Sequence, residues 1–270
     1  RELLRKVLET HPRDQFITLQ LAIATLGLGD LGTRRREMEE AAEHYREVLR
    51  VLDALDESTR GGFDELRLRA RAASSLGTCL ISALEFEATE QSLAAAATVL
   101  DALIARSPAT VRLLVDKATL LHNRALAAAG LDRQDAAAGW FQAAAETWLK
   151  ALPQHPQPPA ALLQTSRDLA RECLARMFED TTVAHQAALE ARRQIDAVDE
   201  KTRSAVVKLA AYQRDLWTLR FVAAVGDIGT APQEARKTLL QCAGAFDRMP
   251  RERDKDWMFL LAALCRVSAL

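Results

Sequence analysis

The clearest candidate for enzyme chemistry in this sequence is a glycine pattern near its start. Gly27-Leu28-Gly29-Asp30-Leu31-Gly32 matches G-x-G-x-x-G, and Asp53 follows at a distance typical of a ribose-binding acid. In dinucleotide-binding folds such glycines let backbone N–H groups and a helix N-terminus approach a pyrophosphate. Dinucleotide binding through Gly27, Gly29 and Gly32 is therefore one alternative function for the chain.

Three observations favour a different role for these glycines. The stretch that would form the acid-bearing strand, residues 48–55, continues the helical pattern before it. Asp53 also recurs as Asp101 in a repeated pentapeptide, and no later stretch supplies the further parallel strands that such a sheet needs. We therefore expect the glycines to form a hairpin turn between two helices, where glycine tolerates positive φ.

Other catalytic chemistry finds little support in the residue pattern. None of the five histidines belongs to an HExxH motif or to a close metal-binding pair. The sequence also contains neither a Walker A lysine motif nor a Gly-x-Ser-x-Gly nucleophile elbow. We accordingly predict no catalytic residue, no metal and no cofactor for this chain.

Basic side chains recur in the stretches that begin each expected helical pair. If these stretches line one groove, their arginines suit an acidic peptide, because guanidinium binds carboxylate through a paired fork. Ordinary solvated arginines and a purely structural or oligomerisation spacer remain alternatives. The predicted groove residues are Arg71, Lys117, Asn123, Arg124, Arg167, Arg171, Lys208 and Arg214.

The elements that must position these residues follow from an internal repeat. The pentapeptide Val-Leu-Asp-Ala-Leu at residues 51–55 recurs verbatim at residues 99–103, which is 48 residues later. Looser markers follow at similar spacing, and residues 7–12 resemble residues 152–156. A period of this length is typical of solenoids, in which stacked hairpins bury faces that each hairpin alone would expose.

Between the markers, apolar residues recur at the spacing of helix faces. We expect two helices per unit, and we expect one helix over residues 202–225 and an Asp132 N-cap after a C-terminal Gly130. The chain is thus predicted to be a single all-α domain, a solenoid of about five helical hairpins. Its expected units are residues 13–60, 61–108, 109–156, 157–199 and 200–250, with partial helices at 1–12 and 251–270 whose apolar ends could self-associate.

Composition agrees with this prediction. The chain has 270 residues, of which 50 are Ala and 5% are aromatic, so an all-β fold is nearly excluded. A net charge of -1 gives no support for nucleic-acid binding, and no uninterrupted apolar run approaches the length of a membrane span. The four widely spaced cysteines favour buried reduced thiols and a cytoplasmic location.

The pattern resembles tetratricopeptide-type repeats. The residues that carry this resemblance are Ala22, Leu26 and Gly27 with Ala41, Ala42 and Tyr45; Ala73, Leu76 and Gly77 with Ala94 and Ala95; and Ala125 with Ala137, Trp140 and Phe141. The longer period is similar to that of the arrays that follow the catalytic domain of large bacterial serine/threonine protein kinases. The resemblance implies a non-catalytic protein-binding scaffold in a bacterial signalling protein.

Overall fold

The computed structural model describes residues 2–3, 6, 14–55, 61–107, 110–177 and 179–249. Throughout these residues the secondary structure is helical with no strand, and the helices pack against their neighbours in sequence, so the all-α prediction is confirmed there. The expected helix at 251–270 lies outside the described residues, as does most of the expected helix at 1–12.

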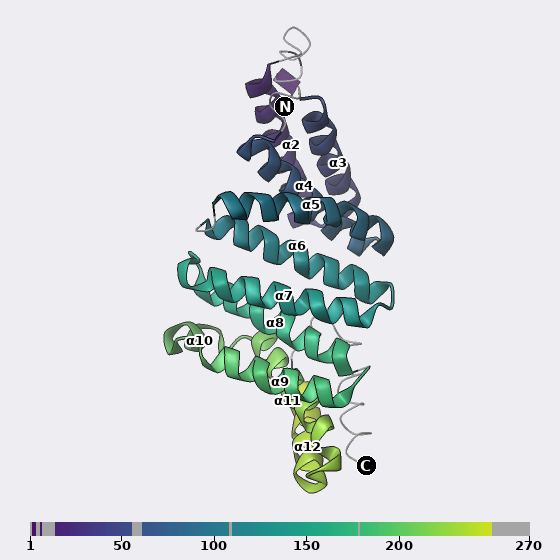
Figure 1. Cartoon of the computed structure of the whole chain (residues 1–270), viewed down its shortest axis with the longest axis vertical. Helices are drawn as coiled ribbons and strands as arrows, with labels where there is room; N and C mark the ends of the chain where they lie inside the picture. Colours follow the sequence, from purple (N-terminus) through teal and green to yellow (C-terminus); the bar gives the residue numbers. More distant parts are fainter. Residues whose placement is uncertain are drawn as a thin grey trace. The chain divides into compact units, whose positions relative to one another are not determined.

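The chain divides into two compact units, residues 1–132 and 133–270. In unit 1, α3 packs against α2 and α4, and α5 packs against α4 and α6 (Figure 1). The first helix of each pair also contacts the next first helix, α2 with α4 and α4 with α6. The helices of unit 1 are α2 (Gln15–Arg35), α3 (Met38–Asp53), α4 (Phe63–Ser82), α5 (Phe86–Arg106) and α6 (Val111–Gly130).

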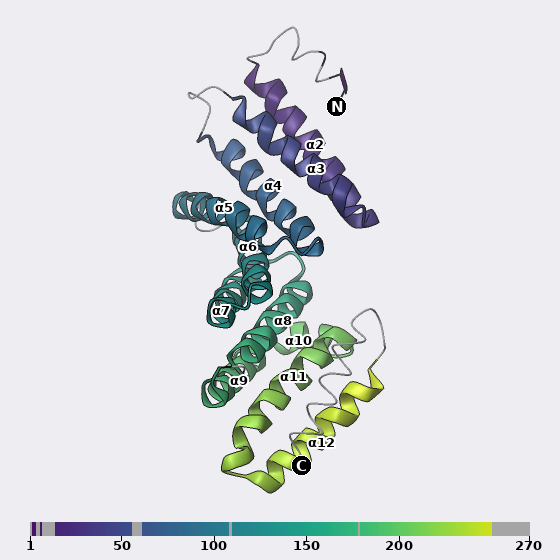
Figure 2. The same ribbon diagram turned by 90° about the vertical axis from the view of Figure 1, so that its right-hand side faces the viewer.

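Unit 2 follows the same neighbour pattern with one added helix. The helix α7 packs against α8, and α8 packs against α9. The helix α11 contacts α8, α9 and α12 (Figure 2). The short helix α10 packs on α8. The helices are α7 (Gln134–Ala151), α8 (Pro158–Met177), α9 (Thr181–Asp196), α10 (Glu200–Val206), α11 (Ala210–Gly226) and α12 (Pro232–Arg248).

The predicted turn at the glycines is wrong, because Gly27, Gly29 and Gly32 all lie inside α2. The strand and loop that a dinucleotide site needs are therefore not formed at this position. Two of the glycines instead let α3 approach closely. A Cβ on Gly29 would lie 2.6 Å from the Tyr45 ring, and one on Gly32 would lie 3.1 Å from the Cβ of Ala41.

The turns of unit 1 use non-glycine residues in the left-handed conformation. Arg36, Leu84 and Asp132 have φ of 68°, 62° and 58°, and they recur at intervals of 48 residues. In the first two turns the next N–H, from Glu37 or Glu85, donates to a carbonyl five residues back. The same backbone motif thus repeats with the sequence period. Asp132 consequently belongs to the turn, and the expected Asp132 N-cap and post-helical Gly130 are wrong.

The repeat is also visible in ion pairs between consecutive hairpins. Asp53, near the end of α3, pairs with Arg69 of α4 at 2.6 Å, and Asp101 of α5 pairs with Lys117 of α6. In each case the base follows the acid by 16 residues. The aspartate of the repeated pentapeptide therefore marks an ion pair between one hairpin and the next.

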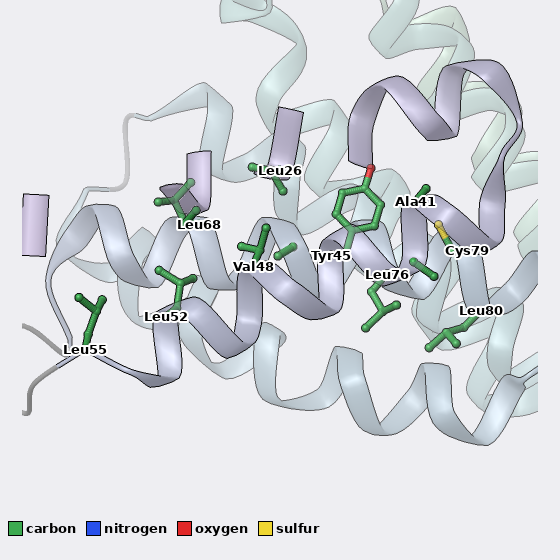
Figure 3. Packing of buried hydrophobic residues seen from close by; sticks show 13 residues of the cluster. Leu26, Ala41, Tyr45, Val48, Leu52, Leu55, Leu68, Leu76, Cys79 and Leu80 are labelled. Atoms are coloured by element: carbon green, nitrogen blue, oxygen red, sulfur yellow. The ribbon is translucent and has the colours of Figure 1, made fainter. Parts of the chain in front are cut away.

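A buried cluster of apolar side chains joins α2, α3 and α4. Tyr45, Val48 and Leu52 of α3 are at most 1% exposed, and they share one buried cluster with Leu26 of α2 and with Leu68 and Leu76 of α4 (Figure 3). The Tyr45 hydroxyl donates to the Asp30 carboxylate at 3.1 Å, so its polar end is satisfied. Burial raises the pKa of Tyr45 to about 12.

Two further expectations have different outcomes. The single helix expected over residues 202–225 is wrong, because residues 207–209 separate α10 from α11. The buried reduced thiols are confirmed for Cys79, Cys173 and Cys242, which are buried and unbridged. Cys265 lies outside the described residues.

The space at Gly29 gives a first test. We expect Gly29→Ala to lower the free energy of unfolding by about 1–3 kcal/mol, because the Tyr45 ring must move. Gly27→Ala is the matched control, since nothing lies within 4 Å of its Cβ position; it should be neutral or stabilising by up to about 1 kcal/mol. Urea unfolding of both variants measures the difference, and equal midpoints would contradict the packing.

The turn at Leu84 gives a second test. Its side chain is 73% exposed and its φ is positive, so Leu84→Gly should stabilise the chain by about 1 kcal/mol. Leu189→Gly removes an exposed leucine from the interior of α9, and it should destabilise the chain by about 1 kcal/mol. Thermal unfolding of the pair should therefore move in opposite directions.

Candidate functional site

In unit 1 the charged residues of the first helices form an interlocking row. Arg71 of α4 donates to Asp30 of α2 at 2.5 Å. On its other side, Arg71 lies near Asp116 of α6, together with Arg67 and Arg112. The predicted groove residue Arg71 is therefore held between two carboxylates from the neighbouring first helices.

Asp116 is a poorly solvated member of this row. Its Oδ2 atom is buried and accepts no hydrogen bond within the part of the chain that the structure describes. Burial raises the pKa of Asp116, and the three nearby guanidinium groups only partly offset this rise. The ionised carboxylate thus destabilises the fold relative to its protonated form.

The other predicted residues of unit 1 lie apart from this row. Asn123 is 4% exposed and donates to the Ser74 carbonyl at 3.2 Å and to Thr78 Oγ1 at 2.9 Å, so it links α6 to α4. Lys117 pairs with Asp101, as described above. Arg124 lies half-buried on α6. The side-chain amide of Asn123 therefore donates its hydrogens to groups inside the fold and not to a bound peptide.

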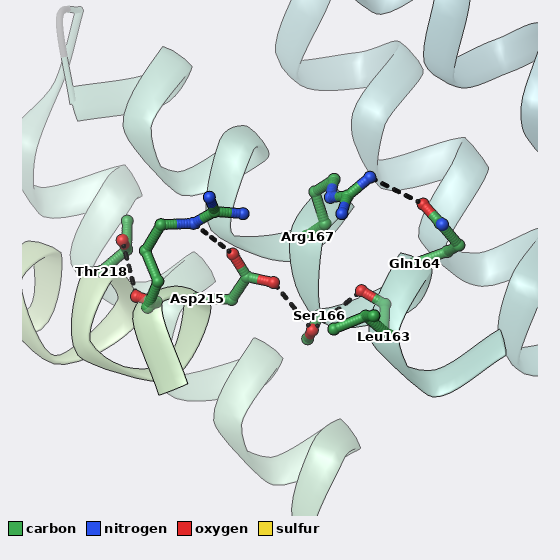
Figure 4. A network of polar contacts seen from close by, with 7 residues as sticks. Leu163, Gln164, Ser166, Arg167, Asp215 and Thr218 are labelled. Carbon is green, nitrogen blue, oxygen red and sulfur yellow. Dashed lines mark hydrogen bonds and ion pairs between the residues drawn. The ribbon is translucent and has the colours of Figure 1, made fainter. Parts of the chain in front are cut away.

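In unit 2 the structure brings three predicted residues together. Arg167 and Arg171 of α8 and Arg214 of α11 surround two carboxylates, Asp168 and Asp215. Arg214 Nε lies 3.4 Å from Asp215 Oδ1, and Ser166 Oγ donates to Asp215 Oδ2 at 3.0 Å (Figure 4). These five charged groups are named the α8–α11 cluster below.

The α8–α11 cluster has an excess of positive charge. It combines three guanidinium groups with two carboxylates. Burial lowers the pKa of Arg171, and the neighbouring charges of Arg167 and Arg214 lower it further. Arg171 also lies over the Phe141 ring, 5.8 Å from its centre, so the ring face stabilises part of this charge.

Asp215 links α8 to α11. It is 3% exposed, and burial raises its pKa, whereas Arg214, Ser166 and Arg167 lower it. Because the Ser166 hydroxyl lies on α8 and Asp215 on α11, this bond fixes how the two helices meet. Arg167 and Arg214 are half-buried on either side of it and keep part of their surface in solvent.

Lys208 and a mainly apolar hollow of unit 2 lie elsewhere. Lys208 is exposed in the turn between α10 and α11. A hollow of about 460 Å³ has mainly apolar walls, including Leu149, Pro153 and Val198, where α7, α8, α9 and α10 meet. None of the eight predicted groove residues lines it. The predicted groove arginines therefore lie outside this hollow.

The residues missed from the sequence are mostly carboxylates. Asp116, Asp168 and Asp215 each lie near several arginines, and Asp30 accepts a hydrogen bond from Arg71, although the predicted groove contained no acidic residue. A signal was present, because Asp168 and Asp215 each directly follow an arginine and Asp116 comes one turn after Arg112. This spacing indicated that aspartates lie on the same helices as the arginines, but it did not indicate which aspartates would be buried.

Comparison with known proteins adds no assignment: no family model matches the chain, and no curated protein matches it significantly. Within the described residues, no group of three or more His, Cys, Asp or Glu side chains could hold a metal ion.

The raised pKa of Asp116 gives a test with a defined sign. A carboxyl group whose pKa is raised by folding stabilises the fold at low pH, and this contribution is lost as the pH rises through the folded-state pKa. Asp116→Asn mimics the neutral form, so we expect it to raise the urea midpoint at pH 7 and to have less effect at pH 4.

Asp199 provides the control of opposite sign. It caps α10 by accepting the Thr202 N–H at 2.9 Å, and hydrogen bonds from the side chain and then the backbone of Thr202 lower its pKa. Asp199→Asn should therefore lower stability at pH 7 and lose its effect as the pH falls below the ordinary range for aspartate. The same sign of effect in both variants at pH 7 would contradict the burial of Asp116.

Proposed function

We propose that this chain is an α-solenoid of tetratricopeptide-like repeats that serves as a non-catalytic scaffold for protein interaction. The 48-residue recurrence of the turns and of the interhairpin ion pairs supports the repeat architecture. The resemblance of the Leu-Gly and Ala-rich pattern supports a regulatory region of a larger bacterial signalling protein, such as a serine/threonine kinase.

The ligand that fits best is an extended protein segment bearing carboxylate side chains. The observation that carries this proposal is the excess of positive charge in the α8–α11 cluster. Arg167 and Arg214 come from two helices packed side by side, and both are half-buried. A guanidinium held in this way loses little conformational entropy when it binds a carboxylate.

Catalysis has less support from the same geometry. The charged side chains of the cluster are engaged with one another, and Asp215 accepts a hydrogen bond from Ser166 and contacts Arg214. The glycine motif that favoured a nucleotide lies within a helix. The described residues thus offer binding groups on rigid elements, which is the arrangement expected of a scaffold.

Peptide binding by the full chain tests this proposal. The probe is a labelled 12-residue peptide library rich in Asp and Glu, compared with the same library carrying Asn and Gln. We expect the acidic library alone to bind, with an affinity that falls as salt rises. Arg167→Gln and Arg214→Gln should each weaken binding about tenfold, as for a charged hydrogen bond of about 1.5 kcal/mol.

Arg193→Gln is the matched control, because Arg193 is an exposed arginine on the second helix α9, paired with Glu190. It should leave the affinity unchanged. Equal binding of the two libraries, or equal losses in all three variants, would exclude an acidic ligand at the cluster. A chain that binds neither library would instead fit a structural spacer.

A further inference from the structure

A second hollow of unit 2 lies where α7 and α9 both pack against α8. It has a volume of about 380 Å³, which is within the usual range of ligand pockets. None of the eight predicted groove residues lines it, and its charged side chains are three glutamates and one arginine. These residues are Glu146 of α7, Glu172 and Arg176 of α8, and Glu190 of α9. Negative charge is therefore in excess in this hollow, which is named the acidic hollow below.

Glu172 is the most deeply buried of these carboxylates. It is 6% exposed, and Arg176 Nε donates to its Oε1 atom at 2.9 Å. Its other oxygen, Oε2, accepts no hydrogen bond from any residue that the structure describes. The Nη2 atom of Arg176 instead donates to Gln142 Oε1 at 3.0 Å. Glu172 thus brings to the hollow a buried carboxylate whose second oxygen lacks a hydrogen-bond donor.

The charge of Glu172 is only partly compensated. Burial raises its pKa, the paired arginine lowers it through a hydrogen bond and its charge, and the nearby Glu146 raises it again. Glu146 itself is exposed, and its carboxylate accepts a hydrogen bond from the neutral amide of Gln142 at 3.2 Å. Glu190, by contrast, pairs with Arg193, which does not line the hollow. A further cation near Glu172 and Glu146 would therefore stabilise the two carboxylates whose charge has the least compensation.

Two observations favour an organic cation at this position. Within the described residues, no group of three or more His, Cys, Asp or Glu side chains could hold a metal ion. The remaining wall of the hollow includes the apolar side chains of Leu169, Ala187 and Ala191. A lysine side chain combines an ammonium group, which has three hydrogen-bond donors, with an aliphatic stem that packs on apolar surface.

We propose that the acidic hollow binds a lysine side chain of a partner protein, with its ammonium group at Glu172 and Glu146 and its stem against the apolar wall. Glu146 and Gln142 are exposed, so the hollow is open to solvent, and a side chain can enter it while its own backbone stays outside. The proposal rests on the scaffold function proposed above in assigning the lysine to a protein. It does not depend on an acidic ligand at the α8–α11 cluster.

Peptide binding by the full chain tests this proposal. The probe is a labelled 12-residue peptide library rich in Lys, compared with the same library carrying acetyl-lysine, which keeps the stem but loses the charge. We expect the lysine library alone to bind, with an affinity that falls as salt rises. Glu172→Gln and Glu146→Gln should each weaken binding about tenfold, the loss typical of one hydrogen bond to a charged group. Because Glu146 is exposed, its variant reports on binding even if Glu172→Gln unfolds the chain.

Glu234→Gln is the matched control, because Glu234 is an exposed glutamate on the second helix α12 that pairs with Lys237 at 3.6 Å. It should leave the affinity unchanged. Equal losses in Glu146→Gln and Glu234→Gln would assign the binding to the overall charge of the chain and overturn the proposal. Equal binding of the two libraries, or no binding of either, would also overturn it.

Two further comparisons separate this site from other sources of binding. Cadaverine is a free diamine with the stem and ammonium group of lysine, and if it bound as tightly as the lysine library it would overturn the assignment to a protein. A chain that binds the lysine library and not the Asp- and Glu-rich library would exclude the acidic ligand at the α8–α11 cluster and keep the acidic hollow. The reverse result would exclude the acidic hollow and keep the cluster.

Discussion

The close approach of the first and second helices of each pair is the contact on which the rest of this structure depends. In α2 and α4 it occurs at glycine, where the Tyr45 ring fills the space beside Gly29 and Leu93 fills the space beside Gly77. A bulkier residue at either position would separate the two helices. Each second helix could then no longer reach the following first helix, and the continuous core of unit 1 would be interrupted.

This packing brings first helices side by side and so creates the polar contacts between them. Within unit 1, Arg71 bonds to Asp30 and Asn123 bonds to Ser74, while in unit 2 Ser166 bonds to Asp215. Buried charge and amide groups of this kind must be satisfied by specific partners. The same groups therefore fix the helix contacts and position the arginines that remain half-exposed for a ligand.

Much of the fold could be predicted from the sequence because its signals are local and periodic. The apolar spacing predicted helical pairs along the chain, and the repeated pentapeptide marked the 48-residue period of turns and ion pairs. The turn at Arg36 was missed because a non-glycine residue takes the left-handed conformation there, whereas the turn was expected at the glycines of residues 27–32. The break before α11 was missed because no Gly or Pro marks residues 207–209.

The sequence by itself thus determined an all-α chain with a regular hairpin period, since helix formation follows from neighbouring residues. Only the tertiary structure decided what the chemistry-bearing residues do. Gly29 and Gly32 form a helix contact in place of a phosphate loop, and Asn123 bonds to α4. Arg167, Arg171 and Arg214 meet because α8 and α11 pack side by side, although 32 residues lie between the end of α8 and the start of α11. Such meetings depend on the close packing of whole helices, which no local spacing encodes.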